Sequence, residues 1–231
     1  MWSRSVSALG LGAIGHRRFM SVVALIGLAF ACIAPRADAS DQTPGQLVQV
    51  NSEHMIRALE KRRAEFQSHP EALHRFIRGE FSQSFDRVYA ARLVLGDSNR
   101  TTSDADVQAF ADALVDHLMA RYGSSLLKIH PGLRVKVVSE VPLREGSIVK
   151  VLTLIDRANG AQLSVDYLFH QHAGQWQVFD VIVEGISFVQ TFRSVFADVL
   201  RSKSLPAITE DLRDGRILVG PTAIDHPLGG H

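Results

Sequence analysis

Cysteine is almost missing from this chain, whose 231 residues contain only Cys32. A single cysteine cannot form an intrachain disulfide, so no covalent crosslink can stabilise the fold. The sequence also contains no G-x-S-x-G motif and no phosphate-binding P-loop. The absence of these motifs leaves no sequence signature of a nucleophile-elbow hydrolase or of a P-loop nucleotide-binding protein.

Long hydrophobic runs are equally rare, and the one present covers residues 19–35. It follows the basic pair Arg17-Arg18 and precedes Ala37-Asp38-Ala39, which has the small-x-small form of a signal-peptidase site. The run is short and wrongly flanked for a membrane span. We therefore expect residues 1–39 to be a signal peptide, cleaved after its last residue, whose removal also removes Cys32. An uncleaved membrane anchor is the alternative.

The chain also has almost no net charge. Lysine and arginine total 25 against 24 acidic residues, a formal net charge of +1. Residues 1–39 hold four arginines and one aspartate, a net of +3, so removing them takes the charge from +1 to −2. A nucleic-acid-binding domain needs a basic stripe or patch, and none is visible here. We therefore expect no nucleic-acid partner.

Apolar residues at spacings of three and four predict amphipathic helices in both halves of the chain. Gly96 is placed to cap one helix at its C-terminus, Ser103 or Asp104 to cap the next at its N-terminus, and Gly123 to bend it. The expected helices cover residues 46–67, 71–81, 86–95, 105–128, 186–202 and 205–213.

Between these helices the pattern changes to strands, with β-branched residues and alternating polarity. Short links such as Asn159-Gly160 and Ala173-Gly174 favour hairpins, which predict an antiparallel meander. The expected strands cover residues 133–141, 147–156, 161–172 and 175–183. The expected fold is therefore α+β, with N-terminal helices, a four-stranded antiparallel sheet and C-terminal helices that together enclose an apolar cavity. One domain is expected over 40–214, followed by a disordered tail at 215–231.

Three segments carry a resemblance to a known family. Residues 85–96 read FDRVYAARLVLG, residues 110–127 contain a long apolar helix, and residues 176–196 read WQVFDVIVEGISFVQTFRSVF. Together they resemble the MlaC proteins, also called toluene-tolerance auxiliary proteins of an ABC transport system, over roughly residues 44–214. Phe179 and Phe192 stand where the family often has tyrosine, which preserves apolar bulk but removes a hydroxyl group at each position.

The resemblance implies a periplasmic lipid carrier without a cofactor and without catalysis. Such a carrier would hold phospholipid acyl chains between sheet and helices. It would shuttle lipid between an outer-membrane lipoprotein complex and an inner-membrane ABC transporter with its substrate-binding protein. A carrier of hopanoids or other polycyclic lipids, as in a hopanoid-associated branch of the family, is the alternative ligand class.

The candidate lipid-binding residues are apolar side chains on the expected inward faces of the strands and helices. They could equally fill an ordinary core, because a sequence pattern does not distinguish a filled core from a hollow one. The candidates are Leu114, Leu118, Tyr122, Val135, Val137, Val149, Val151, Val165, Tyr167, Phe169, Ile182, Ile186, Val189 and Phe196.

Polar residues near the end of the last expected strand are candidate chemical groups. Asp180 and Glu184 would lie about 13 Å apart on a strand, too far for joint acid–base catalysis. We expect Asp180 to pair with a cation and Glu184 to shape the turn; Arg193 could pair with either carboxylate or with a lipid phosphate. His170 and His172 resemble a metal-binding pair without a third ligand, so we expect exposed polar residues at a hairpin tip.

Two hypotheses from other classes remain open at this stage. A small cone-shaped α+β enzyme would place ionisable groups inside its cavity. An envelope interaction module without a ligand would have a solid core. The lipid extracted from protein purified without detergent would separate phospholipid, hopanoid and ligand-free cases.

Overall fold

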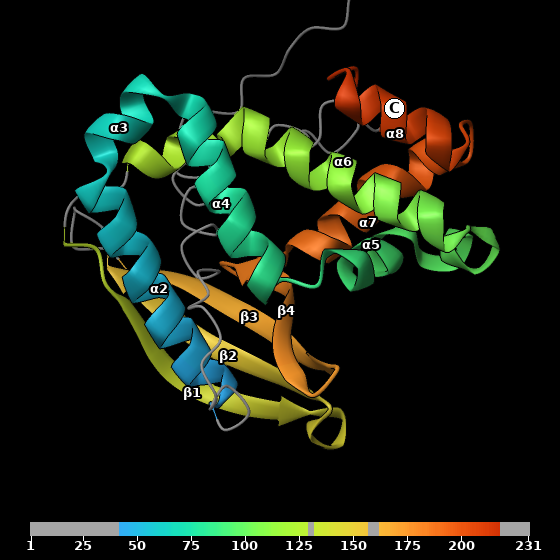
Figure 1. The fold of residues 1–231 in the computed structure, drawn as a ribbon. Helices are drawn as coiled ribbons and strands as arrows, with labels where there is room; N and C mark the ends of the chain where they lie inside the picture. The colour runs from blue at the N-terminus through green and yellow to red at the C-terminus, as the bar shows by residue number, and fades with distance from the viewer. Residues whose placement is uncertain (1–41, 129–131, 157–161, 218–231) are drawn as a thin grey trace, which may run out of the picture.

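The computed structural model describes residues 42–128, 132–156 and 162–217 (Figure 1). The expected signal peptide and the Asn159-Gly160 turn lie outside the described residues. No helix within the described residues combines the length and the apolar character that crossing a bilayer would require.

An antiparallel sheet with the strand order β1-β2-β3-β4-β5 forms one side of the molecule. Each strand pairs with the next along the chain, which confirms the α+β class and the meander. Ala173 and Gly174 both adopt positive φ angles, 51° and 79°, and form the expected two-residue turn between β3 and β4. The strands are β1 Val135–Leu143, β2 Ile148–Asp156, β3 Gln162–His172, β4 Gln175–Val183 and β5 Ile186–Ser187.

The expected count of four strands is corrected by β5. Sequence periodicity placed Ile186 at the start of a helix, but Ile186 pairs with Val183 in a short hairpin. Glu184 and Gly185 make this hairpin through positive φ angles of 49° and 83°. The helix α7, Phe188–Leu200, begins two residues later, because the Ser187 hydroxyl caps it by accepting the Gln190 N–H at 3.0 Å.

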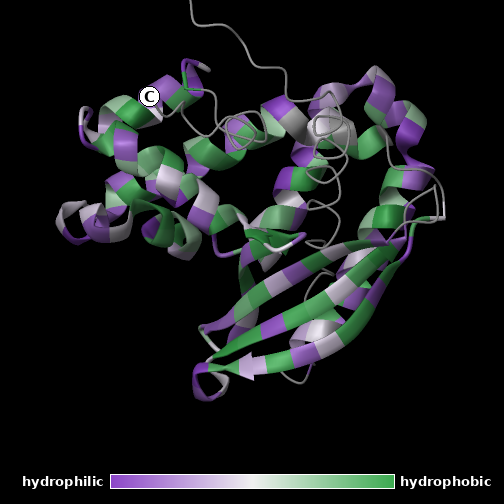
Figure 2. Ribbon diagram, turned by 180° about the vertical axis from the view of Figure 1, so that it is seen from behind, coloured by the Kyte–Doolittle hydropathy of each residue, from purple (hydrophilic) through white to green (hydrophobic). Residues whose placement is uncertain are grey.

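The N-terminal helices cover one face of the sheet (Figure 1). They are α2 Pro44–Lys61, α3 Arg63–Ser68 and α4 Pro70–Ser84. One helix was expected over 46–67, but the backbone leaves the helical region at Arg62 (φ −103°, ψ 15°) and α3 starts in a new direction. Seen from behind, most of the opposite sheet face carries no helix of the described residues (Figure 2).

A helical bundle occupies the other side of the molecule. The Ser103 hydroxyl caps α6, and Gly96 ends α5 with φ 55°, as expected. The predicted long helix ends at Tyr122 and continues as a 3-10 segment from Gly123. The remaining elements of this side are α5 Arg87–Leu95, η2 Gly96–Thr101, α6 Asp104–Tyr122, η3 Gly123–Lys128 and α8 Leu205–Arg213, and the short turn η4 Arg144–Gly146 joins β1 to β2.

Two hydrophobic cores follow from this arrangement. The first lies between the inner sheet face and α2, α3 and α4, with Met55, Phe66 and Tyr167 fully buried. The second lies among α5, α6, α7 and α8, where the Phe110 and Phe196 rings meet edge to face at 5.0 Å. Phe85 and Phe188 pack against both cores, so they mark the boundary between the sheet layer and the bundle.

Residues 215–217 belong to the folded domain and correct the expected start of the tail. The Gly215 N–H donates to the Leu212 carbonyl, and the Arg216 guanidinium binds the Asp211 carboxylate at 2.7 Å. Ile217 packs against the bundle core.

A candidate lipid-binding cavity

A cavity of about 100 Å³ lies where the bundle meets the sheet. Its walls come from the end of α4, from α5, α6 and α7, and from β4. Nearly all of the lining is apolar, and the ionisable residues in it are Arg87 and Asp180. The lining residues are Phe81, Phe85, Arg87, Ala90, Ala91, Val94, Ala111, Leu114, Val115, Leu118, Phe179, Asp180, Val181, Phe188, Val189 and Phe192.

The space exists because small residues meet on facing helices. Ala90 and Ala91 of α5 face the cavity, and so does Ala111 of α6. Each ends at its Cβ atom and so contributes only a methyl group to the lining, beside the larger leucine and phenylalanine side chains. A protein interior is normally packed to the density of an organic crystal, so a hollow of this size in an apolar wall is a feature to explain.

A β-bulge points Phe179 into the cavity. In the β3–β4 ladder, Phe169 pairs with Val178 and Leu168 pairs with Asp180, which leaves Phe179 as the extra residue. A bulge interrupts the alternation of side chains and re-aims those that follow it. Phe179 and Asp180, although consecutive, therefore both line the cavity, and Val178 before them belongs to the sheet core.

Asp180 is a buried carboxylate that joins β4 to the start of α7. One oxygen accepts the Ser187 hydroxyl at 2.6 Å and the other accepts the Val189 N–H at 3.0 Å. Burial raises the pKa of Asp180, and the hydrogen bonds from Ser187 and the α7 backbone oppose that rise. The expected cation pairing is wrong: the carboxylate is held by hydroxyl and N–H donors at a helix N-terminus, where the dipole also favours negative charge.

Arg87 is the one cation in the cavity lining. It extends from the first turn of α5, and its Nε donates to Asp112 Oδ1 at 2.6 Å across to α6. Burial raises the pKa of Asp112, but hydrogen bonds from Arg87 and Gln108 outweigh that effect and lower it. About a third of the Arg87 side chain is exposed, so its charge lies at the mouth and not inside the apolar space.

Three of the fourteen sequence candidates line this cavity: Leu114, Leu118 and Val189. Seven others belong to the inner sheet face and pack in the first core, with Val137 only partly buried. These seven are Val135, Val137, Val149, Val151, Val165, Tyr167 and Phe169.

The remaining candidates lie elsewhere. Ile182 pairs with Asp166 on the sheet face away from α2, because the bulge shifts the alternation in β4. Ile186 is 43% exposed in the β5 hairpin. Phe196 is buried within the bundle core against Phe110 and does not line the cavity. The side chain of Tyr122 lies outside the described residues.

Sequence reasoning missed the α5 wall and Phe179. The sequence candidates are mostly large apolar residues, whereas part of this cavity wall consists of alanines. The small alanine side chains do not stand out in a hydrophobic pattern. The available signal was the pair Ala90-Ala91 opposite Ala111 on helices that were both expected. The bulge at Phe179 has no such signal, because it depends on the pairing of β4 with β3.

Of the two histidines expected to be exposed, His172 is exposed and His170 is not. His170 Nε2 lies 3.1 Å from Asp86 Oδ2, with only 13% of its side chain exposed, and its ring stacks on Tyr89 at 4.1 Å. His172 Nδ1 reaches the same oxygen at 3.2 Å. No set of three or more histidine, cysteine or acidic side chains in the described ranges is arranged to hold a metal ion.

The other polar candidates are structural or peripheral. The Glu184 carboxylate accepts the Ser164 N–H at 2.8 Å and so ties the β5 turn to β3, as expected of a turn-shaping residue. Arg193 is exposed on α7, and its guanidinium lies against Gly96.

Comparison with known proteins identifies the family. The model of the MlaC protein family matches residues 49–214, which is most of the chain. The chain belongs to the MlaC family. Toluene tolerance protein ttg2D of Pseudomonas putida is 25% identical to it over 169 residues, covering 72% of this chain and 77% of that protein.

A solved structure shares the fold of this MlaC protein. It is the phospholipid-binding protein of Ralstonia solanacearum in complex with a phospholipid. The TM-score is 0.62 with 15% identity, covering 70% of this chain and 90% of the other. Two of the segments that carried the family resemblance build walls of the cavity. Residues 85–96 form α5 with its flanking residues, and residues 176–196 form most of β4, all of β5 and most of α7.

Proposed function

We propose that this protein is a periplasmic lipid carrier that holds the acyl chains of a phospholipid in the cavity between α5, α6, α7 and β4. The observation that carries the proposal is the composition of this wall, which is apolar apart from the partly exposed cation Arg87 and the hydrogen-bonded carboxylate Asp180. An amphiphile with an anionic phosphate and long alkyl chains matches that arrangement. The family membership and the phospholipid-binding Ralstonia protein support the same ligand class.

The energetics suit a carrier. Each buried methylene group contributes about 0.8 kcal/mol, so even part of an acyl chain would bind firmly without any covalent or catalytic step. Asp180, the carboxylate in the wall, already accepts hydrogen bonds from α7. It therefore serves the architecture, and a binding role fits the site better than catalysis does.

Loading requires the walls to move apart. Pockets for small ligands usually measure about 300–1,000 Å³, whereas the cavity described above measures about 100 Å³. The boundary residues Phe85 and Phe188 pack against both cores, so separation of bundle and sheet there would enlarge the space with little loss inside either core. We propose that lipid enters along this boundary.

The proposal also includes the route that the lipid takes. The carrier would receive or deliver lipid at an outer-membrane lipoprotein complex and at an inner-membrane ABC transporter with its substrate-binding protein. Residues 1–39, as a signal peptide, would bring it to the periplasm between them.

The test is the lipid that the protein carries. We expect mass spectrometry of protein purified from an exporting host without detergent to detect diacyl phospholipid in near-stoichiometric amount. A pentacyclic triterpenoid in its place would assign the protein to hopanoid transport. Protein that carries no lipid and takes none from vesicles of phosphatidylethanolamine and phosphatidylglycerol would refute the carrier function.

A further inference from the structure

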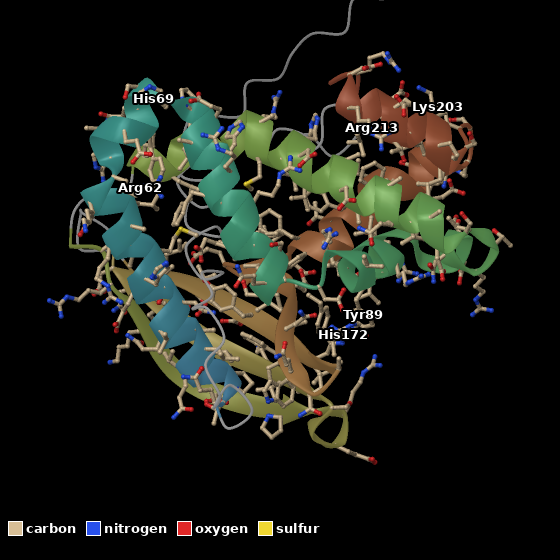
Figure 3. All side chains as sticks on the ribbon, viewed as in Figure 1. Arg62, His69, Tyr89, His172, Lys203 and Arg213 are labelled. Carbon is tan, nitrogen blue, oxygen red and sulfur yellow. The ribbon has the colours of Figure 1, made fainter. Side chains whose placement is uncertain are left out.

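A cluster of polar and aromatic side chains joins the first turn of α5 to the β3–β4 hairpin. Its centre is Asp86, whose Oδ1 accepts the Tyr89 N–H at 2.9 Å and thereby caps α5. The Oδ2 atom lies 3.1 Å from His170 Nε2 and 3.2 Å from His172 Nδ1. One carboxylate thus holds a helix of the bundle and two histidines of the sheet, at the junction where Tyr89 and His172 are labelled in Figure 3.

The same junction is held by backbone and ring contacts. The Asp86 N–H donates to the Val178 carbonyl at 2.8 Å, beside a parallel bridge between Phe85 and Val178. The His170 ring stacks on Tyr89 and meets the Phe179 ring edge to face at 5.5 Å. Phe85 and Phe179 both line the cavity, so this cluster lies directly behind the cavity wall.

We propose that Asp86, His170 and His172 form a clasp that closes the cavity at neutral pH and releases on acidification. The clasp holds the β3–β4 hairpin against α5, and its release lets the two layers separate beside Phe85 and Phe179. This inference rests on the proposed function only for its consequence, faster lipid exchange at acidic pH. The movement itself is a property of the protein without lipid.

The groups around His170 determine the direction of the pH response. Tyr89 and Asp86 face it from α5, and His172 shares its strand. On the flanking strands its register partners are Ile148 and Gln177, neither of which titrates. Two cations of the flanking elements pair with other acids: Lys150 with Asp166, and Arg87 with Asp112.

Neutral His170 is the form that this site favours. Burial lowers the pKa of His170, and Asp86 only partly offsets the effect. A histidine whose pKa is depressed on folding contributes stability above its unfolded pKa of about 6.5, and that contribution is lost as pH falls through the lower folded pKa. The His172 ring, whose centroid lies 6.2 Å from that of His170, also lowers the pKa of His170. Protonation strengthens the direct attraction of His170 to Asp86, but the cost of burying the imidazolium outweighs that gain. Acidification therefore favours the arrangement in which the two layers separate and His170 meets water.

The experiment measures the junction directly in lipid-free protein. Spin labels are placed at Asp97→Cys and Gln175→Cys, both exposed, in a Cys32→Ala background, and their separation is measured at pH 7.5 and pH 5.5. We expect a longer separation at pH 5.5 in the parent protein. The variant His170→Gln keeps an N–H donor for Asp86 but does not titrate, and we expect it to show the pH 7.5 separation at both values.

The matched control is His69→Gln, which removes an exposed histidine outside the clasp and should keep the pH response. An unchanged separation in the parent protein would overturn the proposal, and so would a shift that persists in His170→Gln. A parallel assay follows transfer of fluorescent phosphatidylglycerol to vesicles, which we expect to be several-fold faster at pH 5.5 in the parent and pH-independent in His170→Gln. Label movement without any lipid binding would refute the carrier function and leave the clasp intact.

Discussion

Arg87 is the cation of the cavity lining, and we propose that the phosphate of a bound phospholipid lies beside it. Its first-turn location on α5 places the guanidinium at the cavity mouth, and its salt bridge with Asp112 keeps it extended across to α6. A lipid phosphate at the mouth would share or replace Asp112 as the acceptor. Arginine suits this exchange because its planar fork can hold two acceptors at once.

The variant Arg87→Gln tests this role. We expect affinity for phosphatidylglycerol to fall about fivefold, near 1 kcal/mol, because the contact is partly exposed to solvent. Affinity for diacylglycerol, which lacks the phosphate, should be unchanged. Titration of delipidated protein with each ligand provides the measurement. The control is Arg193→Gln, exposed on α7 against Gly96; a loss confined to that variant would move the head group to Arg193.

Individual residues also show where sequence reasoning reaches its limit. Gly96, Ser103 and the Ala173-Gly174 turn were predictable because capping and turn chemistry are local. Asp180 was not, because its partners depend on how the β5 hairpin returns α7 to β4. His170 looked like a tip residue, yet α5 arrives from a distant part of the sequence and covers it.

At the scale of elements, α5 is the helix on which both the cavity and the clasp depend. Asp86 caps its start, its alanines form a wall, and Gly96 ends it. Gly96 has φ 55° and ψ −126°, and a Cβ atom there would lie 3.1–3.3 Å from the Arg193 guanidinium. A glycine at position 96 therefore lets the chain leave α5 and enter η2 in a backbone conformation that other residues rarely adopt.

A pair of identical substitutions tests the end of α5. We expect Gly96→Ala to lower the free energy of unfolding by about 1–3 kcal/mol, because alanine is strained at this backbone conformation. Gly79→Ala, inside α4 with open space around its Cβ position, should raise it by about 0.5–1 kcal/mol. Denaturant titrations give both values. Equal effects of the two substitutions would show that the α5 terminus is not conformationally restricted.

The alanine wall gives the second prediction at this scale. Ala111→Leu should fill the space between α5 and α6 and lower the bound lipid about tenfold, a common effect of added alkyl volume in an apolar pocket. The cavity can accept the added atoms, so the melting temperature should stay close to that of the parent. Ala105→Leu, exposed on the same helix, is the control. Unchanged lipid content in Ala111→Leu would exclude this wall from the binding site.

Element boundaries were predictable to within a few residues, with two exceptions of clear physical origin. The break at Arg62 leaves the amphipathic pattern unchanged, since α3 buries Phe66 in the same core as α2. The hairpin at Glu184-Gly185 depends on left-handed angles that glutamate rarely adopts. Both features depend on tertiary contacts, and neither changes the spacing of apolar residues in the sequence.

For the whole molecule, the sequence was sufficient for the fold class and the order of layers but not for the position of the hollow. Most of the candidate residues on the strands pack in the sheet core with α2, α3 and α4. The cavity lies instead at the boundary between the sheet and the helical bundle. Periodicity reports which face of an element is buried. Periodicity carries no information on whether the element packed against that face leaves an empty space beside it.

The central claim is that lipid occupies the space between α5, α6, α7 and β4, and a photocrosslinker inside it tests this most directly. Benzoylphenylalanine replaces Leu118 in the cavity wall, and in a separate variant Val138, which is 54% exposed on β1. After loading from phospholipid vesicles and irradiation, we predict a protein–phospholipid adduct by intact mass at position 118 and none at 138. Adducts absent at 118, or equal at both positions, would contradict the account.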